Sequence, residues 1–272
     1  MTSLDRYMDE RLAHGRSYFA KPEAMEALGL TSPQFLAAAE RLVKRQRLAK
    51  PRLGFYLILR PEDRITGAPD PARWIDPLMK HLGLSYRVSL LRAAAFHGSS
   101  HQAAMVFQVV VPKQTRPISL GRHRIQFIHQ ASSAFRKVNQ PDWLDAIKTE
   151  AGYATVAGVE LTLLDCARYL RQAAGINGVA QVVHDLGAKA RPRQLAKAAG
   201  AYENSVVRRL GFLLDHFGHH RQADALLPYA AKAKSLKPLD PSVRTLGALS
   251  SRTHDSDPKW KLVLNEPVEI DA

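Results

Sequence analysis

The sequence has one cysteine, Cys166, and no long apolar run. A single cysteine excludes an intramolecular disulfide and fits a reducing compartment. No stretch approaches the ~20 apolar residues that are needed to cross a bilayer. The first residues include Asp5, Asp9 and Glu10 in place of the apolar core of a signal peptide. We therefore expect a soluble, cytoplasmic protein without a membrane partner.

Acidic residues are scarce and unevenly placed. The 272 residues include 39 Lys and Arg against 25 Asp and Glu, a formal net charge of +14. Residues 41–60 hold seven bases and no acid, and residues 77–141 hold nine bases and no acid. Because a solvated surface normally mixes both signs, these stretches indicate a polyanionic partner. Nucleic acid is favoured over a membrane, since no basic amphipathic helix has an aromatic face.

Length and composition predict a globular protein of two domains. Apolar residues make up 46% of the chain and charged residues 24%, so we expect packed cores. We predict a mixed α+β fold, with an N-terminal winged helix-turn-helix followed by a larger mixed α/β domain rich in helices. The predicted boundaries are 1–62 for the winged domain, 63–72 for a linker and 73–272 for the second domain.

The first 60 residues predict three helices and a β-hairpin. A third helix is expected to begin with Ser32 as N-cap and Pro33 at the first helical position. Two extended runs around a Pro/Gly turn follow over residues 48–58 and predict the hairpin. Five residues form the predicted apolar face of the third helix: Phe35, Leu36, Ala39, Leu42 and Val43. Three helices and a closing hairpin are typical of a winged helix-turn-helix.

The third helix and the hairpin are predicted to contact duplex DNA. A major groove admits one helix, whose exposed N-terminal residues reach base edges. Gln34 suits adenine, and the bases further along the helix suit phosphate or guanine. Cations at the hairpin turn suit the minor groove or adjacent phosphates, although the hairpin also covers the helical core. The predicted DNA-binding residues are Ser32, Gln34, Arg41, Lys44, Arg45, Arg47, Lys50 and Arg52.

The rest of the chain predicts strands first and helices mainly after residue 158. We expect helices over 87–97, 161–170, 206–217 and 223–231, and strands over 105–111, 124–129 and 260–264. The acid-free stretch places a basic face on this domain. Its predicted members are Arg87, Arg92, Lys113, Arg116, Arg122 and Arg124.

Motifs of catalysis or metal binding are incomplete. Gly98-Ser99-Ser100 is similar to a nucleotidyltransferase Gly-Ser motif, but the next acid after Asp76 is Asp142, so the Asp-x-Asp that should follow the motif closely to hold metal is missing. Asp142 is not followed by the Glu-x-Lys of a restriction nuclease. The pair His97 and His101 is interpreted as capping or surface residues, and Cys166 as a buried small hydrophobe. We predict no enzyme, no catalytic residue, no metal and no cofactor.

Four stretches, in order along the chain, resemble AbiEi-type antitoxins. The second has Val159 where that family usually has proline. The four are 86–98 with His101-Gln102, the "Gly-Val-Glu-Leu-Thr-Leu-Leu-Asp" stretch within 158–168, "Arg-Leu-Gly-Phe-Leu-Leu-Asp" at 209–215, and 260–266.

The resemblance implies the antitoxin half of a bacterial type IV abortive-infection system. Such a protein represses its own promoter through inverted repeats and counteracts a nucleotidyltransferase toxin without a stable complex. Residues 73–272 would then form the effector domain that antitoxicity requires. Two alternatives remain open: a stand-alone winged-helix regulator that senses a small effector, and a DNA-processing enzyme. A neighbouring nucleotidyltransferase gene would separate the antitoxin from the stand-alone regulator.

Overall fold

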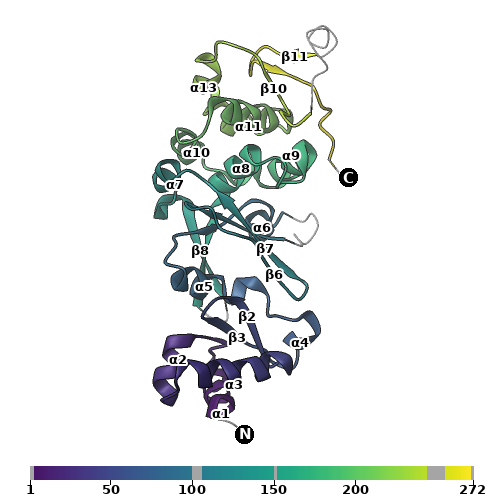
Figure 1. Ribbon diagram of the computed structural model, residues 1–272. Coiled ribbons are helices and arrows are strands. Elements are labelled where there is room, and N and C mark those ends of the chain that lie inside the picture. The colour runs from purple at the N-terminus through teal and green to yellow at the C-terminus, as the bar shows by residue number, and fades with distance from the viewer. Residues whose placement is uncertain (1–2, 100–105, 150–151, 244–254, 271–272) are drawn as a thin grey trace. The chain divides into compact units, whose positions relative to one another are not determined.

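The computed structural model describes residues 3–99, 106–149, 152–243 and 255–270 (Figure 1). Its contacts divide the chain into two compact units, each assembled from several segments. Unit 1 comprises Met1–Arg87, Met105–His129 and Ala146–Thr155, and unit 2 comprises Val88–Ala104, Gln130–Asp145 and Val156–Ala272. The mixed α+β class is confirmed. The predicted boundaries of the linker, which separate the winged domain (1–62) from the second domain (73–272), stay a prediction.

The N-terminal part of unit 1 combines three helices with a three-stranded sheet (Figure 1). Strand β3 lies between β1 and β2 and is antiparallel to both. This element order is that of a winged helix-turn-helix, with β2 and β3 as the predicted hairpin. In chain order the elements are α1 (Ser3–Ala13), β1 (Tyr18–Ala20), α2 (Lys21–Leu28), α3 (Ser32–Lys44), β2 (Leu48–Arg52) and β3 (Phe55–Ile58).

An aromatic cluster fills the core of this helical module. The ring of Phe19 stacks on Tyr56 with centroids 5.5 Å apart, and Phe35 meets Tyr56 edge-on at 5.4 Å. Phe19 and Phe35 are fully buried. Burial of each such side chain contributes about 1.5–3 kcal/mol, and each aromatic pair adds about 0.5–1.5 kcal/mol. The cluster therefore ties α3 firmly to the sheet.

Helix α3 begins differently from the prediction. Thr31 is the N-cap, and Ser32 is already helical. Gln34 accepts a hydrogen bond from the backbone N–H of Thr31 at 2.9 Å and forms a capping box with it. The reason is spacing, because a capping box needs its Gln three residues after the cap, which selects Thr31.

The predicted apolar face of α3 is only partly buried. Phe35, Ala39 and Leu42 lie in the core, but Leu36 is 43% exposed and Val43 is 38% exposed. Measured around the helix axis, both residues lie within about 100° of the centre of the buried face of α3. They are therefore at the edge of that face, where the sheet and the other helices do not cover them.

The remainder of unit 1 includes most of a six-stranded sheet with the order β6-β7-β5-β4-β9-β8. Strands β5 and β7 are parallel, and β6 pairs antiparallel with β7. The predicted strands over 105–111 and 124–129 correspond to β5 and β7, and Met105 lies outside the described residues. The sheet strands are β4 (Arg87–Val88), β5 (Val106–Val111), β6 (Ile118–Leu120), β7 (His123–His129), β8 (Leu144–Thr149) and β9 (Gly152–Ala157).

The predicted linker is structured and packs within unit 1. It includes α4 (Asp63–Thr66) and the fully buried Ala68, and a short 3-10 helix (Pro71–Arg73) and α5 (Ile75–His81) follow. Gly121, in the β6–β7 turn, approaches this segment so closely that a Cβ there would lie 1.9 Å from the carbonyl oxygen of Thr66. The contact requires glycine at position 121.

Unit 2 is mostly helical, and α8, α10 and α11 lie close to one another (Figure 1). Two short 3-10 helices, Pro141–Trp143 and Gly187–Lys189, connect its parts. A small sheet has the order β10-β12-β11. The elements are α6 (Leu90–Phe96), α7 (Ser132–Val138), α8 (Val159–Arg168), α9 (Gly175–Leu186), α10 (Pro192–Ala199), α11 (Asn204–His216), α12 (His220–Asp224), α13 (Leu227–Ala231), β10 (Lys237–Pro238), β11 (Ser256–Asp257) and β12 (Leu262–Val263).

Two predicted helices in unit 2 have other boundaries. The helix expected over 87–97 begins only at Leu90, because Val88 pairs with Val156 as strand. The helix expected over 223–231 is two short helices, α12 and α13. Pro228 lies in the first turn of α13, where the missing N–H is tolerated, and it would break a continuous helix.

Cys166 gives a test of the packing of α8. The thiol is fully buried, and this burial raises its pKa above the ordinary value. The thiolate is the reactive form, so native protein is expected to resist alkylation. Mass spectrometry after treatment with iodoacetamide should find one adduct only once denaturant is added. Rapid labelling of native protein would contradict the buried position.

Candidate functional site

The C-terminal half of α3 presents the predicted bases to solvent. Arg41, Lys44 and Arg45 are all exposed. Lys44 forms an ion pair with Glu40 at 3.0 Å, one helical turn earlier. Glu40 is the only acidic residue between Glu26 and Glu62. It lies one residue before the acid-free stretch 41–60, so the basic face of α3 includes one carboxylate.

The predicted residues at the N-terminus of α3 make local contacts. Ser32 accepts a hydrogen bond at 2.6 Å from the ammonium group of Lys21. Gln34 is held in the capping box, where its Oε1 also accepts from the hydroxyl of Thr31 at 2.8 Å. Base contact by Gln34 would compete with these bonds.

Arg47 and Arg52 take part in packing contacts within unit 1. Arg47 forms ion pairs with Asp5 at 2.7 Å and Asp9 at 3.2 Å, and so joins the end of α3 to α1. Arg52 donates to the backbone carbonyl of Arg116, and its guanidinium lies 5.9 Å from the centre of the Phe127 ring. Of the two hairpin cations, Lys50 is the exposed one.

The second predicted basic face is divided. Lys113, Arg116, Arg122 and Arg124 are exposed in and around the β6–β7 hairpin of unit 1. Arg87 is fully buried, so its prediction as a surface residue is wrong. Its position in the short strand β4, inside the sheet, explains the burial.

Arg92, the last predicted member of that face, lies in α6 of unit 2. It is half-buried, with its guanidinium 5.0 Å from the centre of the Phe96 ring. The structure therefore groups four of the six predicted bases in one hairpin region.

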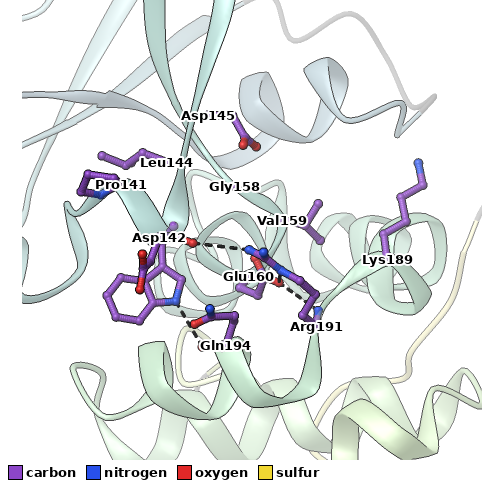
Figure 2. Close-up of a pocket in the computed structure, with 11 residues that line it drawn as sticks. Pro141, Asp142, Leu144, Asp145, Gly158, Val159, Glu160, Lys189, Arg191 and Gln194 are labelled. Carbon is purple, nitrogen blue, oxygen red and sulfur yellow. Dashed lines mark hydrogen bonds and ion pairs between the residues drawn. The ribbon is translucent and has the colours of Figure 1, made fainter.

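Unit 2 contains a polar pocket that the sequence analysis did not identify (Figure 2). The cavity volume is about 390 Å³. Its walls come from the 3-10 helix before β8, the start of α8 and the segment leading into α10. The lining residues are Pro141, Asp142, Trp143, Leu144, Asp145, Gly158, Val159, Glu160, Lys189, Arg191 and Gln194. No local motif marks this site, because three separate segments build it.

An ion pair forms the floor of the pocket. Glu160 is buried and accepts hydrogen bonds from the backbone N–H of Arg191 at 2.9 Å and from its Nε at 3.0 Å. The hydrogen bond with Glu160 raises the pKa of Arg191. The same guanidinium donates to the carbonyl of Asp142 at 3.4 Å. This pair joins the start of α8 to the start of α10 and leaves the Arg191 side chain 64% exposed.

The other polar groups of the pocket lie around this pair. The indole N–H of Trp143 donates to the carbonyl of Gln194 at 3.2 Å. The Oε1 atom of Gln194 is buried and accepts no hydrogen bond from the described residues. Lys189 donates to the carbonyl of His97 at 2.8 Å, and Asp145 lies 3.9 Å from Nε2 of His97.

The described residues contain no group of three or more His, Cys, Asp and Glu that is arranged to hold a metal ion. Nε2 of His97 lies 2.7 Å from the carbonyl oxygen of Ala157. Its predicted neighbour His101 lies outside the described residues. Within the described part of the chain, no helix is long and apolar enough to span a membrane.

Comparison with known proteins assigns the middle part of the chain to a family. Residues 87–216 match the model of the AbiEi antitoxin C-terminal domain. The chain carries an AbiEi antitoxin domain. The resemblance drawn from the sequence is thus confirmed. Residues 87–98 of the first stretch and the stretches at 158–168 and 209–215 lie inside the AbiEi match, and the stretch at 260–266 lies outside it. The AbiEi antitoxin family is regulatory rather than catalytic.

The fold of the chain also occurs in a solved structure. A crystal structure of the RV2827C protein from Mycobacterium tuberculosis superposes with a TM-score of 0.67. The similarity covers 95% of this chain and 90% of that chain, with 17% identical residues. At this identity the likeness concerns the fold alone. No curated protein matches the chain.

Proposed function

We propose that this protein is the antitoxin of a type IV toxin–antitoxin system and represses its own promoter in the cytoplasm. The observation that carries the proposal is the AbiEi domain on the same chain as a module with winged-helix element order. The exposed bases of α3 support DNA binding, because Arg41, Lys44 and Arg45 lie on a helix of the kind that enters a major groove.

The β6–β7 hairpin belongs to the proposed DNA surface. Its four exposed bases lie in the same compact unit as α3. The contacts of Arg52 with Arg116 and Phe127 join the wing to this hairpin. In this proposal Lys50 contacts phosphate, whereas Arg52 and Arg47 act by holding the surface together.

Titration against DNA tests the repressor role. The protein is mixed with its own upstream DNA and with a scrambled fragment at several salt concentrations. Saturable, preferential binding of the upstream fragment is expected, with a log–log salt slope of about −0.9 per neutralised phosphate. Equal and steeply salt-dependent binding of both fragments would contradict sequence-specific repression.

Co-expression tests the antitoxin role. A neighbouring nucleotidyltransferase gene is expected to arrest growth when expressed alone, and the antitoxin is expected to restore growth. We propose that rescue occurs without a stable complex, so the two proteins should separate in size-exclusion chromatography. Growth arrest that persists with the antitoxin present would overturn this role.

A stand-alone regulator that senses a small effector is a second candidate. The polar pocket of unit 2 favours it, because this pocket is of a size that holds small molecules. The absence of a toxin gene beside the operator, together with effector-dependent DNA binding, would select this alternative.

Glu40 provides a test of which face of α3 meets DNA. Its side chain is 68% exposed beside Lys44, and its carboxylate would lie near phosphates. Glu40→Gln is expected to raise the affinity for both DNA fragments roughly threefold at low salt, because one repulsive charge is removed. Glu62→Gln is the matched control, since Glu62 is also exposed but lies outside α3. Equal effects of the two substitutions would place α3 away from DNA.

A further inference from the structure

We infer that the polar pocket of unit 2 binds one nucleotide, with the base beside Trp143, the sugar hydroxyls at Asp145 and the phosphate at Lys189 and Arg191. The inference concerns unit 2 alone and does not depend on DNA binding by unit 1. Figure 2 shows Asp142 and Gln194 toward one end of the pocket and Lys189 toward the other, with Arg191 between them.

The base end combines a ring with hydrogen-bond acceptors. Trp143 is half-buried, and its N–H bond to the backbone of Gln194 holds the indole in place. Aromatic side chains stack on any base. The exposed carboxylate of Asp142 accepts hydrogen bonds, and the exocyclic amino groups of cytosine, adenine and guanine donate them. This end therefore favours a base that carries an amino group.

The phosphate end has two cations and a helix terminus. The side chain of Arg191 stays exposed although its Nε is bonded to Glu160. Lys189 is exposed, and α8 begins at the pocket without a side-chain cap. Free N–H groups at a helix start favour an anion. Asp145, 54% exposed on the wall between the two ends, suits the hydroxyls of a ribose.

Both signs of charge in one pocket exclude simpler occupants. A lone phosphate would leave the carboxylates of Asp142 and Asp145 unused, and a cationic side chain would meet Lys189 and Arg191. A cavity of about 390 Å³ lies near the lower end of the roughly 300–1,000 Å³ that small-molecule sites occupy, which suits a mononucleotide.

Tryptophan fluorescence tests the inference directly. The chain has three tryptophans, and Trp74 and Trp260 are fully buried and do not line the pocket, so quenching that depends on Trp143 reports the ligand. The full chain is titrated with each nucleoside 5′-monophosphate. Saturable quenching is expected with CMP, AMP or GMP and is expected to be weaker with UMP. Trp143→Phe should abolish the signal, while calorimetry should still detect binding.

Substitutions at the two ends separate a nucleotide site from general charge. Lys189→Ala is expected to weaken nucleotide binding roughly tenfold, because a charge-assisted hydrogen bond is lost. Asp142→Asn should reduce the preference for amino-bearing bases. Lys197→Ala is the matched control, since Lys197 is exposed on α10 but does not line the pocket, and it should bind like wild type.

The outcomes that overturn the inference are distinct. Absence of saturable quenching at millimolar nucleotide would do so, as would quenching that Lys189→Ala and Asp142→Asn leave unchanged. Competition by inorganic phosphate as strong as that of the nucleotide would reduce the site to an anion site and reject the base contact. A short single-stranded oligonucleotide shows whether the natural ligand is a free nucleotide or the end of a nucleic acid. If the oligonucleotide binds more tightly than the mononucleotide, the site is assigned to a nucleic-acid end.

Discussion

Replacing Arg41 and Arg45 together by alanine is expected to lower the affinity for the upstream DNA roughly 100-fold at physiological salt. Both side chains are exposed near the C-terminal end of α3. Loss of one arginine contact to DNA costs about 1–3 kcal/mol, and two lost contacts at about 1.4 kcal/mol each correspond to about 100-fold. If both contact phosphate, the log–log salt slope should also become shallower by about 1.8.

A second double substitution, in unit 2, controls for the loss of two positive charges. Arg193→Ala with Lys197→Ala removes two exposed bases of α10 and should change the affinity little. Calorimetry or anisotropy measures wild type and the two double variants against the upstream and scrambled fragments. If the Arg41/Arg45 variant bound as tightly as wild type, the assignment of α3 as the recognition helix would be wrong.

Replacing Trp260 by alanine is expected to lower the free energy of unfolding by about 3–5 kcal/mol. Trp260 is fully buried against α11, and its indole N–H donates to Asp215 at 2.9 Å. The ring packs so closely on Gly211 that a Cβ added there would lie 2.1 Å from a ring carbon. Loss of the indole leaves a cavity and removes a hydrogen bond from a partly buried carboxylate.

Gly211→Ala tests the same contact from the other side. The new methyl group must push the Trp260 ring outward, so destabilisation of about 1–3 kcal/mol is expected. Gly200→Ala is the control, since a Cβ there comes no closer than 3.4 Å to its neighbours and φ is −62°. Scanning calorimetry measures all three variants. A wild-type midpoint for Gly211→Ala would mean that the C-terminal segment does not pack on α11 in this way.

The motifs that carried the family resemblance have structural roles here. In the stretch 209–215, Gly211 makes room for Trp260, and Asp215 accepts its N–H. The first residue of that stretch, Arg209, is buried and donates to the carbonyls of Leu239 and Ala167. These packing contacts explain why the family motif can be identified in the sequence although its residues do not form a binding site.

Side-chain environments were the least predictable property. Arg87 and Arg122 are alike in sequence, both within the acid-free stretch, yet one is fully buried and the other is exposed. The difference depends on the sheet around β4, which pairs Val88 with Val156, 68 positions away. Helical spacing predicted that Leu36 is buried, but its side chain is exposed. Spacing within one helix does not show how far the neighbouring elements extend over it.

The sequence by itself determined the order of elements in the winged module, the excess of positive charge and the AbiEi resemblance. These follow from local spacing, capping residues and composition, which act over a few residues. Only the tertiary structure decided that Arg47 and Arg52 are held in packing contacts and that Asp142, Glu160 and Arg191 meet in one pocket. Those residues come from distant segments, and contacts between them form only when the whole chain buries its apolar surface.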